Sequence, residues 1–328
     1  MLGTYRLLLA CLVLISHCGL VIQKMNPGVV AVISFFLISG YVVTGVYEKK
    51  CHSKAGFIVD RVLRIYPLFF VFLSLTLILL NLFPCKDTFL GYFITKPSLW
   101  ATLLNYLLIP LDFYRFNASE GFQLIPPAWS LGLEMTFYLV FPFLTLKKVK
   151  VTALFLSLAF FCLAAFGVLE TDLYGYRLLP GTLFLFLTGS LYYEDPKGFV
   201  KRILPVLVVL IAVLWGALLK FKFLDVPFNR EILVGYGFAI IALVSLTRLQ
   251  RQKWDEILGA LSYGVFLSHT LVIWGVDSLG GLARFGESTR ILLVILASLV
   301  LAALGHFCVE RPFHRLQLAL RQKLSPEP

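Results

Sequence analysis

Residues 203–220 read ILPVLVVLIAVLWGALLK and carry no charge before Lys220. A run of this length matches the roughly 20 apolar residues that a helix needs to cross the hydrocarbon core of a bilayer. It does not alternate between apolar and polar residues, which favours a helix over a strand of a membrane barrel. Similar runs recur along the 328-residue chain, which is 59% hydrophobic and only 14% charged. The sequence therefore predicts an all-α, polytopic integral membrane protein.

The apolar runs predict about ten membrane spans within a single domain, residues 1–328. The first run has the length of a secretory signal peptide, but it lacks a small-residue cleavage site and contains Arg6 and His17. We therefore interpret it as a membrane helix. Residues 84–128 are predicted to form an external loop, in which a proline-interrupted apolar part is either re-entrant or interfacial. In chain order, the predicted spans cover residues 5–22, 28–47, 66–83, 129–146, 151–169, 178–193, 203–220, 232–247, 257–275 and 291–309.

The distribution of basic residues predicts the orientation of these spans. With the N-terminus in the cytoplasm, about two thirds of the 29 lysines and arginines lie in cytoplasmic regions, as the positive-inside rule requires. Both ends of the chain are then cytoplasmic, and residues 311–328 form a cytoplasmic tail. The net charge of +11 would suggest nucleic acid as a partner of a soluble protein. Here the basic residues flank membrane spans, so we expect membrane lipids and no nucleic acid.

The six cysteines predict neither a disulfide framework nor a metal site. Cys11, Cys18, Cys162 and Cys308 fall within apolar spans, and the chain has no CxxC pair. The histidines also lack the HxxH and HExxH spacings that are typical of zinc sites. We therefore expect no metal.

Ionisable side chains inside membrane spans are rare and suggest function. Arg6 and His17 are eleven positions apart, close to three full helical turns, so both side chains share one helix face at about 16 Å along the axis. The alternative for Arg6 is a topology anchor that snorkels to the surface. The alternative for His17 is an interhelical hydrogen bond.

Two further ionisable residues lie at a similar predicted depth. Glu134 follows the start of an inward-running span, and His269 precedes the end of an outward-running span, as His17 does. Helical rise places all three in the outer third of the membrane, so we predict a shared polar cavity. A histidine suits a general base toward a hydroxyl, and a carboxylate can orient the imidazole or act on a proton itself. Which histidine is the base stays open, and the alternative is a structural hydrogen-bond cluster.

A second polar group is predicted at the cytoplasmic face, made of Arg6, Arg61, Arg64 and Arg311. Arg61 and Arg64 are one helical turn apart, and guanidinium groups suit bidentate binding of phosphate. For each arginine taken singly, the alternative is again orientation by the positive-inside rule. Glu310 could also pair with one of these arginines.

Three more histidines lie near the cytoplasmic side. His306, one turn before Glu310, is interpreted as structural. His52 and His314 lie in basic loops and are predicted to be solvated.

Six motifs occur in a fixed order along nearly the whole chain. They are Arg6 with His17; Phe35-Phe36-Leu37-Ile38-Ser39-Gly40-Tyr41; Arg61-Val62-Leu63-Arg64-Ile65-Tyr66-Pro67; Trp129-Ser130-Leu131-Gly132-Leu133-Glu134 with Phe137-Tyr138; Ser262-Tyr263 through His269; and Glu310-Arg311-Pro312. Each motif alone is weak. Together they resemble the acyltransferase-3 family of bacterial integral membrane acyltransferases.

The resemblance implies a ten-helix core that moves an acyl group, commonly acetyl, from cytoplasmic acyl-CoA to a hydroxyl group. The implied acceptor is a cell-envelope glycan, such as the O-antigen of lipopolysaccharide, an exopolysaccharide or a lipid-linked sugar. The implied location is the bacterial inner (plasma) membrane. Arg6 and His17 would be functionally required, and Arg61, Arg64 and Glu134 match family positions. Many relatives append a soluble SGNH-type domain, which this chain lacks, so we expect it to complete the transfer alone or with a separate partner.

We combine the two polar groups into one hypothesis. The cytoplasmic arginines, Arg311 included, bind the phosphates of acetyl-CoA or another acyl-CoA. The acyl group then reaches the catalytic group His17, Glu134 and His269, where a sugar hydroxyl attacks from the external side. His17 would be either the general base or a transient acyl carrier.

Three other functions stay open at this point. The enzyme could acylate a small molecule, such as a secondary metabolite, instead of a glycan. A transporter or flippase for lipid-linked saccharides would also have about ten helices and buried polar groups. A structural membrane scaffold would tolerate substitution of Arg6, His17 and Glu134.

Overall fold

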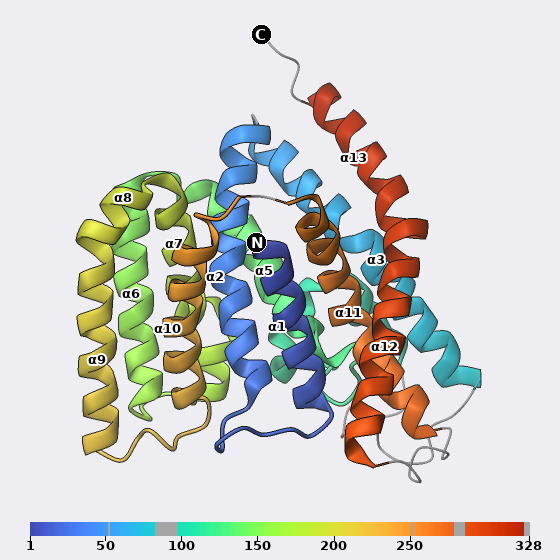
Figure 1. The fold of residues 1–328 in the computed structure, drawn as a ribbon, viewed down its shortest axis with the longest axis horizontal. Helices are drawn as coiled ribbons and strands as arrows, with labels where there is room; N and C mark the ends of the chain where they lie inside the picture. The colour runs from blue at the N-terminus through green and yellow to red at the C-terminus, as the bar shows by residue number, and fades with distance from the viewer. Residues whose placement is uncertain (52, 83–97, 251, 279–285, 325–328) are drawn as a thin grey trace. The chain divides into compact units, whose positions relative to one another are not determined.

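The computed structural model describes residues 1–51, 53–82, 98–250, 252–278 and 286–324. Apart from turns and one isolated bridge between Ile22 and Met25, these residues form helices, which confirms the all-α prediction (Figure 1). The elements are α1 (Leu2–His17), α2 (Pro27–Lys50), α3 (Lys54–Leu82), α4 (Leu99–Leu107), η2 (Ile109–Phe116), η3 (Pro126–Ala128), α5 (Trp129–Val140), η4 (Phe141–Phe143), α6 (Lys147–Ala165), η5 (Thr171–Arg177), α7 (Leu179–Glu194), α8 (Pro196–Gly198), η6 (Phe199–Ile203), α9 (Leu204–Lys220), α10 (Asn229–Leu246), α11 (Lys253–Ser278), α12 (Glu287–Gly305), η8 (His306–Glu310) and α13 (Arg311–Leu324).

Each predicted span coincides with a helix. Among the described residues, 7 helical segments are long and apolar enough to cross a membrane, and they contain α2, α3, α6, α9, α10, α11 and α12. The other three spans match α1, α5 and α7, whose 16, 12 and 16 residues are fewer than a helix perpendicular to the bilayer needs. The chain is thus a multi-pass helical membrane protein.

The chain divides into two compact units. The first unit contains Met1–Leu20, Ile58–Met135 and Arg251–Pro328, and the second contains Val21–Phe57 and Thr136–Gln250. All the predicted site residues belong to the first unit. In the second unit, α2 packs closely on α7, because Gly40 lies against the backbone of Phe186 and Gly189 against the backbone of Leu37. Small residues allow this close approach of helices in membranes.

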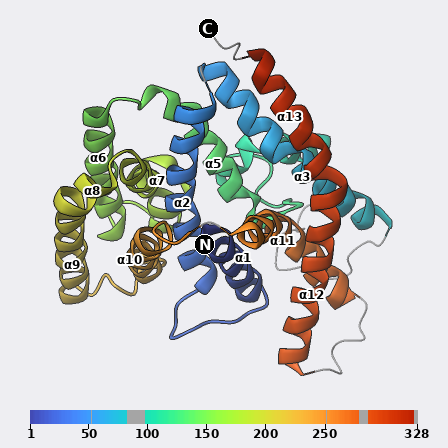
Figure 2. The same ribbon diagram turned by 45° about the horizontal axis from the view of Figure 1, so that its top comes forward.

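In the first unit, α1 and α11 run parallel, side by side (Figures 1 and 2). Gly3 at the start of α1 faces Asp255 and Gly259 near the start of α11, and His17 at the end of α1 contacts His269. Asp255 holds the beginning of α1, since its carboxylate accepts from the backbone N–H groups of Gly3 (3.1 Å) and Thr4 (2.8 Å). A carboxylate at a helix N-terminus satisfies backbone donors that have no partner within the helix.

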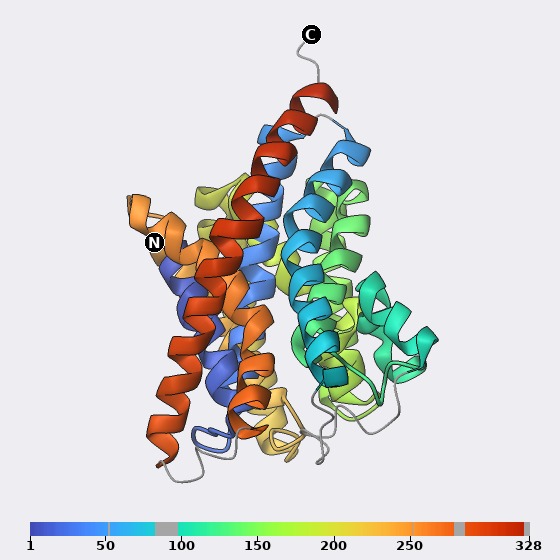
Figure 3. The same cartoon turned by 90° about the vertical axis from the view of Figure 1, so that its right-hand side faces the viewer.

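The C-terminal part of the chain departs from the prediction of a plain tail. α12 packs against α11, with Gly264 close to Ala302, and it continues through η8 into α13 (Figure 3). Residues 311–324 are therefore helical. The sequence alone did not show this, because the charged run after Glu310 and the proline that follows Arg311 are typical of a span that ends.

Two other boundaries were predicted wrongly. α1 ends at His17 and does not continue to Ile22, because Gly19 (φ 101°), Gln23 (φ 49°) and Lys24 (φ 64°) adopt left-handed backbone conformations that no α-helix contains. His17 is therefore the last residue of its helix, and the depth that was predicted from a longer span does not apply.

The third helix also begins earlier than predicted. α3 starts at Lys54 and includes Arg61 and Arg64, which were assigned to the preceding loop. Pro67 lies inside this helix, although proline and basic residues usually indicate a boundary.

Part of the segment predicted as an external loop packs against a neighbouring helix. α4 lies along α3, because the Tyr66 hydroxyl donates to the carbonyl of Leu107 (2.7 Å) and Tyr106 is hydrogen-bonded to Ser74 (2.9 Å). Ser74 lies about 12 Å along the axis before the end of α3. Trp100 on the outer side of α4 is 59% exposed. An apolar outer face beside the middle of a membrane span favours the re-entrant alternative over the interfacial one.

Candidate functional site

Two histidines meet where α1 ends beside α11. The Nε2 atom of His269 lies 3.4 Å from the Nδ1 atom of His17, and the two ring centroids are 5.1 Å apart with a tilt of 49°. His269 is 0% exposed. The positions of the two residues differ by 252, the same offset that joins Gly3 to Asp255 at the other end of the helix pair. The parallel packing of α1 on α11 therefore sets the contact between the histidines.

The hydrogen bonds of the two rings assign their protons. His17 Nδ1 lies 2.9 Å from the carbonyl oxygen of Val13, and His269 Nδ1 lies 3.1 Å from that of Val265. A carbonyl oxygen only accepts, so Nδ1 carries the proton in each neutral ring. The lone pair of His269 is then on Nε2, which accepts from the Nδ1–H group of His17. His17 keeps its own lone pair on Nε2, and no donor or acceptor in the described residues contacts that atom.

This arrangement gives the two histidines different chemical abilities. His269 has both ring nitrogens in hydrogen bonds and is buried, so its ring orientation is fixed. His17 offers Nε2 to a reacting group, while two acceptors at its Nδ1–H would stabilise the imidazolium ion that forms on proton uptake. The pair can therefore act as a base and its orienting neighbour, as carboxylates orient histidines in hydrolases.

Glu134 lies on α5 and is half-buried. The segment before it, η3, packs against α11, the helix of His269. The contact between His17 and His269 is thus confirmed as a pairing of two predicted site residues. The addition of Glu134 to this pair stays a prediction.

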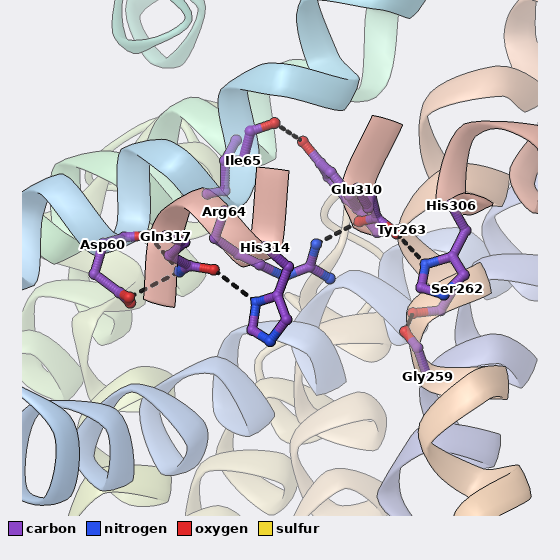
Figure 4. A network of polar contacts seen from close by, with 10 residues as sticks. All are labelled: Asp60, Arg64, Ile65, Gly259, Ser262, Tyr263, His306, Glu310, His314 and Gln317. Carbon is purple, nitrogen blue, oxygen red and sulfur yellow. Dashed lines mark hydrogen bonds and ion pairs between the residues drawn. The ribbon is translucent and has the colours of Figure 1, made fainter. Parts of the chain in front are cut away.

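Arg64 of α3 is held by a carboxylate of η8 (Figure 4). Arg64 forms an ion pair with Glu310, whose other oxygen lies 2.8 Å from Nδ1 of His306. The Arg64 guanidinium also lies 5.5 Å from the centre of the Tyr263 ring, and the Tyr263 hydroxyl donates to the carbonyl of Ile65 (2.8 Å). Three of the six sequence motifs therefore meet in one polar network of the first unit.

Arg61 has a carboxylate of its own. It is 7% exposed, and its Nε donates to Asp60 Oδ2 (3.0 Å), which also pairs with its terminal nitrogen. Arg311 is exposed and stacks on Phe307 with 4.7 Å between the guanidinium carbon and the ring centre. Arg6 lies on α1 shortly after the Thr4 anchor to Asp255. A joint role of these arginines in donor binding stays a prediction.

The smaller predictions about the cytoplasmic side have mixed outcomes. Glu310 pairs with an arginine, as one alternative proposed, and His306 supports that pair. His314 is exposed but lies in helix α13 and hydrogen-bonds Gln317 (3.0 Å), so its assignment to a loop was wrong. His52 lies outside the described residues.

Sequence reasoning missed three residues that hold these elements together: Asp60, Asp255 and Gln317. Asp60 was visible as an acidic residue directly before Arg61. Asp255 was visible as an acid two residues before the predicted span 257–275, near a helix start where carboxylates are favoured. Gln317 gave no signal, because a neutral amide in a polar segment is common on any exposed helix. Within the described residues, no three His, Cys, Asp or Glu side chains come together to hold a metal ion.

The fold and the histidine pair define a class: a multi-pass helical membrane protein with two histidines in contact and an arginine–carboxylate network among its helices. Residues 4–306 match the acyltransferase-3 family, described as an acyltransferase domain, and the chain belongs to this family. The protein is therefore a membrane acyltransferase of the O-acetyltransferase type.

Its relatives agree with this family. Nodulation protein 10 of Rhizobium leguminosarum bv. viciae is 28% identical over 96% of this chain and 93% of its own length. The exopolysaccharide production protein ExoZ of Rhizobium meliloti (strain 1021) is 25% identical over 90% of this chain and 92% of its own. An uncharacterised protein of Aquifex aeolicus (strain VF5) is 33% identical over 46% of this chain and 71% of its own. No solved structure matches the chain.

Proposed function

We propose that this membrane acyltransferase moves an acetyl group from cytoplasmic acetyl-CoA to a hydroxyl of a cell-envelope polysaccharide or its lipid-linked precursor. The membrane would be the bacterial inner membrane. The observation that carries the chemistry is the His17–His269 contact, which leaves one basic nitrogen available at His17. The support for a polysaccharide acceptor is the relative ExoZ, an exopolysaccharide production protein.

The pair suits direct acyl transfer. The acceptor hydroxyl oxygen attacks the thioester carbonyl carbon while its proton passes to Nε2 of His17. The carbon–sulfur bond then breaks, and His17 returns the proton to the leaving sulfur, so the products are an ester and a free thiol. During the step, the carbonyl of Val13 and Nε2 of His269 both accept from the Nδ1–H of the imidazolium. His17 is thus a base in this proposal and not an acyl carrier, because its free nitrogen is needed for the proton.

The donor would bind through the arginines. Arg6, Arg61, Arg64 and Arg311 supply guanidinium groups for the phosphates of acetyl-CoA, as bidentate arginine–phosphate contacts do elsewhere. Glu310 fixes the direction in which Arg64 extends. Preorganised side chains lose less conformational freedom when the ligand binds.

The decisive test measures acetyl transfer by purified protein in lipid nanodiscs. Wild-type protein with radiolabelled acetyl-CoA and envelope glycan should give labelled, hydroxylamine-sensitive glycan ester. His17→Ala should lower the rate by about 10²–10⁴-fold, the usual contribution of a general base, while the protein remains monodisperse.

The rival functions give different results in this assay. Full activity of the His17→Ala variant would contradict the role of His17. A wild-type protein that transfers lipid-linked saccharide across the bilayer without forming an ester would instead be a flippase. Mass spectrometry of envelope glycans from cells with and without the gene then identifies the acceptor, and unchanged acetyl content would favour a small-molecule acceptor.

A further inference from the structure

A buried amide joins the C-terminal helix to the arginine motif. Gln317 of α13 is 2% exposed, and its side-chain nitrogen donates to Asp60 Oδ1 (2.7 Å) and to the Asp60 carbonyl (2.9 Å). Figure 4 shows this contact between α13 and α3. Because both partners are oxygen acceptors, the amide orientation is fixed: nitrogen toward Asp60 and oxygen away from it.

The chain of hydrogen bonds continues on both sides of this contact. The amide oxygen of Gln317 lies 3.0 Å from Nδ1 of His314, which therefore carries a proton and donates. Asp60 Oδ2 accepts from Arg61. His314 thus donates to Gln317, Gln317 donates to Oδ1 of Asp60, and Arg61 donates to the other oxygen of the same carboxylate.

The amide competes with the arginine for the charge of a single carboxylate. The Asp60 side chain is 0% exposed, so it depends on protein donors for solvation. A donor on Oδ1 draws negative charge from Oδ2 and weakens the attraction that Oδ2 exerts on the guanidinium of Arg61. If Gln317 were absent, Asp60 would hold Arg61 more strongly, and less of the cation's charge would be available to an external anion.

We propose that Gln317 is a positioning residue for Arg61, acting through Asp60, so that α13 sets the affinity of the cytoplasmic side for an anionic acyl donor. This inference rests on the proposed function, which assigns Arg61 to the phosphates of acyl-CoA. The chemical class of ligand is a polyphosphate thioester. The expected effect is on donor binding and not on the acyl-transfer step, because no contact joins Gln317 to His17 or His269 within the described residues.

Binding of CoA to purified protein in nanodiscs tests the proposal without catalysis. Gln317→Leu has a similar size and no polar atom, and it should weaken CoA binding and raise KM for acetyl-CoA by about tenfold. The kcat should stay within twofold. Leu318→Ala, at the neighbouring and 44% exposed position, is the matched control and should change neither value.

A double variant separates this role from simple attachment of α13. Asp60→Asn removes the charge that Gln317 offsets, so Asp60→Asn with Gln317→Leu should bind CoA about as well as wild type. If Gln317 only attaches α13, the double variant should bind as weakly as Gln317→Leu. Asp60→Asn alone should bind CoA at least as tightly as wild type, and this variant tests the idea even if Gln317→Leu does not fold.

The outcomes also distinguish this inference from the proposed function. If wild-type protein binds CoA and Gln317→Leu binds it equally well, only the role of Gln317 is wrong. If wild-type protein neither binds CoA nor uses acetyl-CoA, the donor assignment itself fails, and the inference fails with it.

Discussion

His17 and His269 touch each other, but their surroundings differ. His269 lies inside α11, fully buried, with a hydrogen bond at each ring nitrogen. His17 ends α1, and among the residues that the structure describes only its Nδ1 is engaged. A side chain with both nitrogens engaged is suited to orient its neighbour, and one with a free lone pair is suited to take a proton. The two histidines therefore have unequal roles, which the sequence could not assign.

Substitutions at His269 test this difference. The amide of glutamine reaches about as far as the Nε2 atom of histidine, so His269→Gln retains an oxygen that can accept from the Nδ1–H of His17. We expect kcat of His269→Gln to be within about tenfold of wild type and that of His269→Leu to fall by about 10²-fold or more. Steady-state acetyl transfer measures both. Equal losses in the two variants would show that His269 does not act through this hydrogen bond.

Particular residues show how far the sequence predicted the site. The sequence predicted a shared polar cavity for His17 and His269 from a depth that the shorter α1 does not support, yet the structure brings the two rings into contact. The contact between Asp60 and Gln317 was not foreseen, because the two residues are 257 positions apart and only the fold brings them together. Local periodicity carries no information about such pairs.

At the scale of elements, the α1–α11 pair supports the candidate site. An added Cβ at Gly3 would lie 1.8 Å from the carbonyl oxygen of Asp255, closer than any real contact. The two helices approach this closely only because Gly3 and Gly259 lack side chains. Because both helices are rigid, the distance between them at Gly3 also affects the contact between His17 and His269 at the other end of the pair.

Gly3→Ala should therefore push α1 away from α11. We expect a destabilisation of about 1–3 kcal/mol from overpacking, seen as a lower Tm in detergent, together with reduced acetyl transfer. Gly216→Ala on α9 is the control, since nothing lies within 4 Å of its added Cβ. Alanine there should be neutral or slightly stabilising, because it favours a helix. A Gly3→Ala variant as stable and active as Gly216→Ala would disprove the close packing.

At the scale of the whole molecule, hydropathy predicted which segments are helices but not all of their ends. A helix that crosses a membrane needs a long apolar run because hydrocarbon surrounds it, so the composition of a segment is enough to predict such a helix. The chain after α1 contains residues with left-handed backbone conformations, such as Gln23 and Lys24. Their residue types do not predict that conformation. The position of α4 depends on tertiary contacts with Tyr66 and Ser74, which no local pattern contains.

The orientation of the first unit can be tested with three matched positions. Because α11 runs parallel to α1 and α12 returns beside it, α13 lies on the side where α1 begins. The basic residues predict that this side is cytoplasmic. Leu20, Leu103 and Leu318 are 38%, 47% and 44% exposed, so cysteines at these positions differ in their surroundings and not in burial by protein.

A membrane-impermeant maleimide on intact cells should label Leu20→Cys, in a background with the native cysteines replaced. Leu318→Cys should react only after the inner membrane is opened, and Leu103→Cys in neither case, because α4 faces lipid and maleimide needs a hydrated thiolate. Labelling of Leu103→Cys in intact cells would show that α4 lies at the external surface and would favour an interfacial helix. Labelling of Leu318→Cys in intact cells would place α13 outside, and the arginine network with it, where cytoplasmic acyl-CoA has no access.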